Sequence, residues 1–409
     1  MTQAVERKII DFIDSRRSAE TGFLAELVKV PSDNPAGDCT KHAERAAELL
    51  EGLGLEVERH PVPKETVEAQ GMISATNLVV RRKFGDGPVI ALNAHGDVVP
   101  PGEGWSVDPY GAEIRDGWMY GRGVAVSKSD FATYIFALLA LEDAGAPLNG
   151  AVEVHLTYDE EAGGDIGPKW LLDQGITKPD YSIGAGFSYG VVTAHNGCLH
   201  LEVEVNGRSA HAALPDTGFD ALEAANGIMA TLYAERRTYR DRPSATPGIG
   251  APQMTIGLIS GGINTNVVPD KVAFRLDRRI VPEEDLGAVE ARVRDVVERA
   301  AAEFEGISVT VRRILLAEPL PRLPGAERLS EALCRRAGEV FGCEVEPKGV
   351  PLYTDARHYT AAGIPTVLYG AGPRTIEEAN AHRADERLPL DDLYGATKVV
   401  ALTLLDILG

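Results

Sequence analysis

The feature that most constrains the fold is a change in strand pattern near residue 195. Before that point, Pro88–Asn93 is a continuous apolar run, which is typical of a strand buried on both faces of a sheet. Another strand, Ala151–Thr157, follows a long predicted helix over Asp130–Ala144, for which Ser129 or Asp130 is the predicted cap. Strands that alternate with helices in this way indicate a mostly parallel α/β sheet.

After residue 195 the strands change character. Leu199–Val205 alternates apolar and polar residues, which is typical of an antiparallel sheet with one face in water. The predicted elements run strand, helix, strand, strand, helix, strand, the ferredoxin-like order. We therefore predict an α/β domain formed by residues 1–194 and 315–409, with a ferredoxin-like α+β domain inserted over 195–314.

Composition excludes several classes of partner. The 409 residues carry 41 basic and 61 acidic side chains, a net charge of −20. A nucleic-acid binder shows a basic footprint, and an anionic membrane surface also selects for one, so we expect neither partner. None of the 4 cysteines forms a CxxC pair, which argues against a cysteine zinc site. The N-terminus has no secretory pattern, so we expect a cytoplasmic protein. We also expect no organic cofactor.

Two polar clusters follow the buried strands directly. His95 and Asp97 come at the end of the Pro88–Asn93 run, and Glu160 and Glu161 follow Ala151–Thr157. Ligands of open α/β sheets gather at the carboxyl ends of strands. A histidine can bind a metal there, and of two adjacent carboxylates one can bind it while the other moves protons. Taken singly, such a histidine is more often structural and such an acidic run more often a solvated loop.

Two further stretches contain polar groups of the same kind. Gly370–His382 is a glycine-rich loop that ends in a histidine, and Gly207–His211 lies in the insert. Asn266 and the Arg278-Arg279 pair, also in the insert, can bind a carboxylate through an amide and a planar guanidinium. Ordinary exposed polar residues explain each of these equally well in isolation.

Taken together, these stretches resemble the metallopeptidase family of aminoacylase, carboxypeptidase G, acetylornithine deacetylase and succinyl-diaminopimelate desuccinylase. The resemblance covers nearly the whole chain, and it implies that the insert is a lid that often forms a homodimer interface. The matching stretches are His95–Pro100, Trp105–Gly123, Asp159–Glu161, Arg208–Pro215, Asn266–Pro269, Asp277–Pro282, Thr354–Arg357 and Tyr369–Gly372.

The resemblance implies roles for the residues at the strand ends. It makes His95, Glu161 and His382 metal ligands and Asp97 the group that orients His95. Glu160 is then the general base that activates water. The discontinuous domain is accordingly the catalytic, metal-binding one.

For the insert, the resemblance implies that His211 polarises the scissile carbonyl, reaching into the partner subunit's site. It also implies that Asn266 and Arg279 bind the carboxylate of a small-molecule substrate.

Two positions depart from the family pattern. Val126 stands where the family has an aspartate that bridges two metals, and Gly186 stands where it has an Asp or Glu ligand. Neither side chain can bind a metal, so we predict one divalent ion per chain, held by two histidines and one carboxylate. Mn²⁺, Zn²⁺ and Fe²⁺ all suit that set. Asp130 is a candidate replacement ligand, although helix capping explains it as well.

These inferences predict a metal-dependent hydrolase of a C–N bond in an N-acyl amino acid or a dipeptide. The alternative is a hydrolytic deaminase of an aromatic amine, because the family includes an aminohydrolase of 5-nitroanthranilate. A third possibility is a catalytically inactive relative that only binds its ligand.

Overall fold

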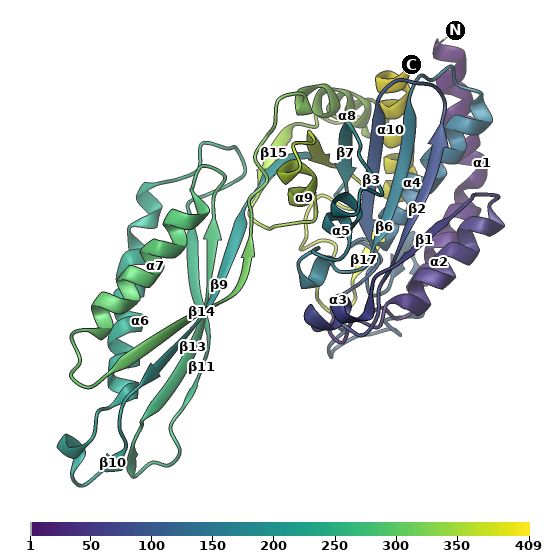
Figure 1. Ribbon diagram of the computed structural model, residues 1–409. Helices are drawn as coiled ribbons and strands as arrows, with labels where there is room; N and C mark the ends of the chain where they lie inside the picture. Colours follow the sequence, from purple (N-terminus) through teal and green to yellow (C-terminus); the bar gives the residue numbers. More distant parts are fainter. Residues whose placement is uncertain (1) are drawn as a thin grey trace. The chain divides into compact units, whose positions relative to one another are not determined.

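The computed structural model describes residues 2–409, which divide into two compact units (Figure 1). The first unit runs from the start of the described chain to Thr193 and resumes over Arg322–Lys348 and Thr354–Gly409. The second unit comprises Ala194–Pro321 together with Gly349–Tyr353. It therefore extends past residue 314, where we predicted that the insert ends, and takes in a short later segment.

The first unit is built on an eight-stranded sheet in the order β1-β2-β6-β3-β7-β16-β8-β15. Its central strands β6, β3, β7 and β16 are parallel, whereas β1, β2 and β8 pair antiparallel. The strands are β1 (Glu58–Pro61), β2 (Thr76–Lys83), β3 (Val89–His95), β6 (Ala151–Thr157), β7 (Tyr181–Gly184), β8 (Val191–His195), β15 (Pro347–Val350) and β16 (Thr366–Leu368). A small second sheet joins β4 (Glu113–Arg115), β5 (Trp118–Tyr120) and β17 (Arg387–Pro389).

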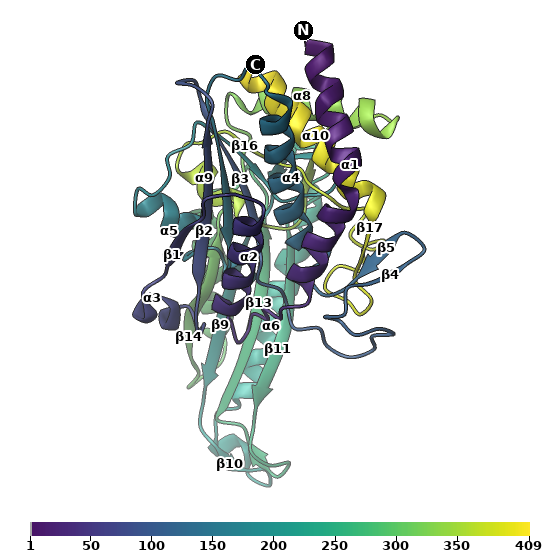
Figure 2. The same cartoon turned by 90° about the vertical axis from the view of Figure 1, so that its right-hand side faces the viewer.

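Helices cover both faces of the large sheet (Figures 1 and 2). Successive side chains of a strand point to opposite faces. Accordingly, Ile90 and Leu92 of β3 belong to the main core, while Ala91 packs with Tyr359 and Leu172 in a separate cluster. The helices of this unit are α1 (Thr2–Val28), α2 (Thr40–Gly52), α3 (Lys64–Ala69), α4 (Lys128–Ala144), α5 (Pro168–Asp173), α8 (Ala326–Phe341), α9 (Ala356–Ala361) and α10 (Leu390–Leu408).

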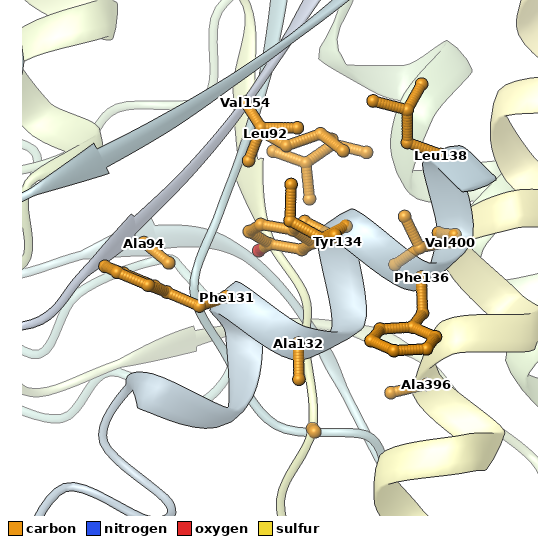
Figure 3. Packing of buried hydrophobic residues seen from close by; sticks show 14 of the residues in the cluster. Leu92, Ala94, Phe131, Ala132, Tyr134, Phe136, Leu138, Val154, Ala396 and Val400 are labelled. Atoms are coloured by element: carbon orange, nitrogen blue, oxygen red, sulfur yellow. The ribbon is translucent and has the colours of Figure 1, made fainter. Parts of the chain in front are cut away.

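Helix α4 is the centre of the main core. It is buried along nearly its whole length, as expected for a helix that is apolar on all sides. Figure 3 shows its side chains between Leu92 and Val154 of the sheet and Ala396 and Val400 of α10. Helix α4 thus fixes the segment before it, residues 121–127, which passes the ends of the central strands.

The second unit has the ferredoxin-like order. Its four antiparallel strands lie in the order β11-β13-β9-β14, and α6 and α7 pack on one face. The elements are β9 (Gly197–Asn206), β10 (Ala210–His211), α6 (Ala221–Arg237), β11 (Gln253–Gly261), β12 (Val267–Val268), β13 (Lys271–Ile280), α7 (Leu286–Ala301) and β14 (Ser308–Ala317). Short 3₁₀ turns lie at Glu160–Ala162, Pro215–Thr217 and Tyr239–Asp241.

The predicted fold class is confirmed: a mostly parallel α/β sheet with a separate antiparallel α/β unit. One local prediction is wrong. Helix α4 begins at Lys128, and Ser127 at its N-cap position makes no capping bond with its side chain. Neither Ser129 nor Asp130 is therefore its cap. None of the helices in the described chain has the length and apolar character that crossing a membrane needs.

Candidate functional site

The ends of β3 and β6 bring two of the predicted clusters together. His95 is the last residue of β3 and lies opposite Thr157, the last residue of β6. The Gly96 amide donates to the Thr157 carbonyl at 2.9 Å, which continues the pairing one step further. The two chain segments that leave these strands therefore start side by side.

Asp97 holds the two segments in place. Its carboxylate is fully buried. Oδ1 accepts the Glu160 amide at 3.2 Å, and Oδ2 accepts the Glu161 amide at 3.1 Å and the Asn34 side-chain amide at 3.0 Å. Each carboxylate oxygen is thus used to fix backbone, so both glutamate side chains leave a rigid turn.

His95 presents one nitrogen to the site. Its Nδ1 lies 2.9 Å from the Asp97 carbonyl, and a carbonyl can only accept, so Nδ1 carries the proton. Nε2 is then the lone-pair nitrogen that a metal takes. Ser127 Oγ lies 3.2 Å from both the amide and the carbonyl of His95, which fixes the backbone as well.

Three ligand-bearing side chains converge at this point. One ligand atom from each of His95, Glu160 and Glu161 lies within 4.8 Å of the others. His95 Nε2 is 4.0 Å from Glu160 Oε2. His382 adjoins the group, with Nε2 at 3.3 Å from Glu161 Oε1. Glu161 Oε1 is buried and accepts no hydrogen bond, so this oxygen has the free valence of a cation ligand.

The charges of the site favour a cation. Burial is the main cause that raises the pKa of Glu160 to about 8; the neighbouring carboxylates Glu161 and Asp97 act in the same direction, and His95 acts against them. Burial lowers the pKa of His95, but the Asp97 hydrogen bond and the Glu160 charge outweigh it and raise that pKa well above its usual value. The neighbouring Glu161 carboxylate raises the pKa of His382. A metal ion at this position would supply the positive charge that these acids lack.

Asp130 lies outside this cluster of ligand atoms. It is fully buried, with Oδ1 accepting the Ala371 amide at 2.8 Å and Oδ2 accepting the Gly186 amide at 3.1 Å. It is not among the residues whose ligand atoms converge. A Cβ on Gly186 would lie 2.9 Å from the Tyr369 backbone nitrogen, so no side chain fits there without a backbone shift.

The predicted residues of the insert lie in the second unit, in two groups. His211 is exposed on β10, where its Nδ1 accepts the Ala213 amide at 3.0 Å. The backbone carbonyl of Asn266, next to β12, accepts the Ala212 amide, so Asn266 lies beside the His211 strand. These side chains are exposed and are much less restrained than those around Asp97.

Arg279 lies in the four-stranded sheet. Its Nε and Nη2 are both 3.0 Å from Asp277 Oδ2, and His200 Nε2 is 3.6 Å from the same oxygen. The guanidinium also lies over the Tyr353 ring, 6.0 Å from its centroid. Asp277 therefore sets the orientation of Arg279, a contact that the sequence pattern did not indicate.

Comparison with known proteins finds relatives over most of the chain. The model of "Peptidase family M20/M25/M40" matches residues 91–406. Succinyl-diaminopimelate desuccinylase from Wolinella succinogenes is 28% identical over 405 residues, covering 95% of this chain and 98% of that protein. Acetylornithine deacetylase from Myxococcus xanthus is 28% identical over 356 residues, 86% of this chain and 88% of that one.

Solved structures match in fold. The M20 family metallo-carboxypeptidase Sso-CP2 from Sulfolobus solfataricus superposes with a TM-score of 0.76 at 20% identity, over 95% of this chain and 99% of that one. Human carnosine dipeptidase 1 gives 0.75 at 18% identity and covers 98% of both chains.

Proposed function

The chain belongs to peptidase family M20/M25/M40 and is a metal-dependent hydrolase of amide or peptide bonds, and we propose that it acts with a single divalent ion on a small carboxylate-bearing substrate. The observation that carries this proposal is the convergence of His95, Glu160 and Glu161 around a buried oxygen without a hydrogen bond. The family match confirms the resemblance that the sequence predicted.

The residues present fit one ion. His95 Nε2 and Glu161 Oε1 are the two available ligand atoms, and His382 beside Glu161 is the third ligand in our proposal. Val126 and Gly186 add no ligand atom, and the packing of Gly186 against Tyr369 supports the single ion. Two histidines and a carboxylate suit Mn²⁺, Zn²⁺ or Fe²⁺.

Glu160 is the general base in this proposal. When bound, a divalent ion lowers the pKa of a coordinated water and polarises the scissile bond. Glu160 takes a proton from the attacking water and returns it to the leaving nitrogen, the two transfers that a general acid–base residue performs. Asp97 keeps the Glu160 backbone and the His95 ring fixed during the reaction.

The second unit supplies substrate contacts in this proposal. In the homodimer proposed below, Arg279 of one subunit and Asn266 of the other hold the substrate carboxylate, and His211, which lies beside Asn266, stabilises the negative charge that develops on the scissile carbonyl. The substrate class is an N-acyl amino acid or a dipeptide, in line with the desuccinylase and deacetylase relatives.

A second candidate is hydrolytic deamination of an aromatic amine such as 5-nitroanthranilate. The specific observation in its favour is the site itself, which offers ligands for one ion and no side chain at residue 186. An anthranilate carries a carboxylate that the same Arg279 and Asn266 can bind. The inactive-relative alternative does not account for the convergence of His95, Glu160 and Glu161.

We further propose a homodimer through the second unit, and a cytoplasmic location stays a prediction. Strand β11 is an edge strand whose Leu258 and Ile259 are 62% and 55% exposed. Exposed apolar edge strands favour pairing with a second chain. Light scattering tests this: Leu258→Arg is expected to give monomers, and Leu222→Arg on α6 is the matched control. A wild-type monomer would contradict the dimer.

Metal analysis and a substrate panel test the function. After loading with Mn²⁺, Zn²⁺ or Fe²⁺ and desalting, we expect about one ion per chain, as for a mononuclear catalytic site. His95→Ala should lose it and His60→Ala, a histidine on β1, should keep it. Two ions per chain would overturn the single-metal proposal.

The panel holds N-succinyl and N-acetyl amino acids, dipeptides and 5-nitroanthranilate, with products read by mass spectrometry. Turnover of the amides supports the first proposal. Turnover of the anthranilate alone supports the deaminase. A loaded protein that turns over none of them supports the inactive relative.

A further inference from the structure

A buried ion pair joins the two loops that border the metal centre. Arg122 and Glu386 are 264 residues apart in sequence and each only 1% exposed, and Arg122 Nη1 donates to Glu386 Oε2 at 2.6 Å. A backbone hydrogen bond also joins the two loops: the Gly121 amide donates to the Glu386 carbonyl at 2.9 Å. Nothing in the proposed reaction uses either side chain.

On one side, the pair restrains the loop that carries His382. Arg122 Nη2 donates to the carbonyl of Arg383 at 3.2 Å, the residue after His382, and to the Pro101 carbonyl at 3.1 Å. In this loop Asn380, His382 and Asp385 all have positive φ, at 50°, 61° and 57°. Left-handed non-glycine residues are unfavourable and persist only where the surroundings hold them.

On the other side, the pair restrains the segment that contacts His95. Glu386 Oε1 accepts the amides of Ala125 and Val126 at 3.1 and 3.2 Å. The next residue is Ser127, whose Oγ lies 3.2 Å from the His95 amide and carbonyl. The Glu386 carboxylate, together with Arg122, thus links the segment that contacts His95 to the loop that carries His382.

We propose that the Arg122–Glu386 pair positions both His95 and His382, and so sets the metal affinity of the centre. This rests on the metal centre proposed above. A buried ion pair is an inefficient way to stabilise a fold, because apolar side chains of similar volume often do as well. Directional bonds to two backbone segments are what an apolar contact does not provide, and orienting groups around ligands typically change metal affinity when removed.

The test measures Zn²⁺ affinity of the metal-free, full-length chain by competition with a coloured chelator, and thermal unfolding of the same samples. Glu386→Gln leaves Arg122 with an uncompensated charge, so the double variant Arg122→Met, Glu386→Gln removes both charges. Asp406→Asn is the matched control, because Asp406 also binds a largely buried arginine, Arg336, at 2.6 and 2.7 Å.

We expect a 10–100-fold weaker Zn²⁺ affinity in both Glu386 variants and an unchanged affinity in Asp406→Asn, even where the control melts at a lower temperature. A folded double variant with wild-type affinity would overturn the proposal. His95→Ala and His382→Ala separate the two ideas. If neither weakens Zn²⁺ binding, the metal centre itself is wrong; if both do and the pair variants do not, only the positioning role fails.

Discussion

The first unit contains acidic side chains of a kind that is not found among the shifted acids of the second unit. In the first unit, burial raises the pKa of several carboxyl groups, among them Glu20, Asp130, Asp159, Glu160 and Asp355. In the second unit, arginine partners lower the pKa of carboxyl groups near the surface, such as Glu202 and Glu235. Acids of the first kind oppose folding when charged, whereas acids of the second kind support it.

A comparison of Glu160 with Glu20 shows that a raised pKa alone does not identify a functional site. Burial raises the pKa of each to about 8. Glu160 stands among other carboxylates and a histidine, whereas Glu20 lies between α1 and α10 and accepts a hydrogen bond from Thr397. A perturbed pKa therefore marks burial, and only converging ligand atoms mark a site.

Glu160→Gln is the change with the largest expected effect. The amide cannot take a proton from water, so we expect kcat to fall by about 10²–10⁴-fold, the usual contribution of a general base. Steady-state kinetics on the substrate found in the panel measures it. Glu20→Gln, an acid equally shifted but remote from the ligands, is the control and should keep wild-type kcat. Equal losses in both variants would contradict the role of Glu160.

Glu20→Gln has the second largest expected effect, on stability. The folded chain keeps the Glu20 proton up to about pH 8, whereas the unfolded chain loses it near 4.5. The contribution of Glu20 to the free energy of unfolding is therefore fully present below about pH 4.5. It is lost as the pH rises through 8, by up to about 1.4 kcal/mol per pH unit.

The variant has no such proton, so its stability relative to wild type should increase between pH 5 and pH 8. Urea unfolding at several pH values measures this difference. Two parallel stability curves would show that Glu20 titrates normally.

Asp97→Asn tests whether the anchored turn matters beyond the general base. An amide keeps one accepting oxygen but faces the second backbone N–H with its own N–H groups, so the Glu161 segment loses its fixed position. We expect kcat and Zn²⁺ affinity to fall about 10–100-fold, as for groups that orient metal ligands. Asp86→Asn, in an exposed loop, should change neither; a variant of Asp97 with normal Zn²⁺ affinity would limit the anchor to catalysis.

Much of the fold follows from the sequence because its main elements have strong periodicity. β6 occupies the predicted Ala151–Thr157, and α4 ends at the predicted Ala144. Short strands such as β5 and β17, three residues each, carry no periodic signal and were not predicted. Their pairing is set by tertiary contacts, and it is this pairing that brings Glu386 to Gly121.

The strand pattern pointed to the site only where the chemistry follows a strand directly, whereas His382, in a loop, was assigned through the family resemblance. His95 and Glu160 come at the ends of adjacent parallel strands, so sequence alone brings them together. Asp130 resembles a helix cap in the sequence, and only the structure reveals that it lies inside α4 and that its partners are Ala371 and Gly186. Glu386 has the appearance of a surface acid, because nothing local in the sequence indicates an arginine 264 residues away.

The smallest expected effect on stability lies in the second unit, and its pH dependence has the opposite sign to that of Glu20. Glu235 on α6 receives Nε and Nη2 of Arg292 from α7 at 3.1 and 2.9 Å, and this hydrogen bond lowers the pKa of Glu235. The Arg292 side chain is half exposed, so water and salt screen the pair. Glu235→Gln should therefore destabilise the chain by at most about 1 kcal/mol, and less in high salt. Because the folded pKa is depressed, this stability is present above about pH 4.5, the ordinary glutamate value, and is lost as the pH falls below it. Urea unfolding in low and high salt measures the loss; a salt-independent loss, or one that grows toward pH 8 as with Glu20, would mean that the two units do not differ in the way proposed.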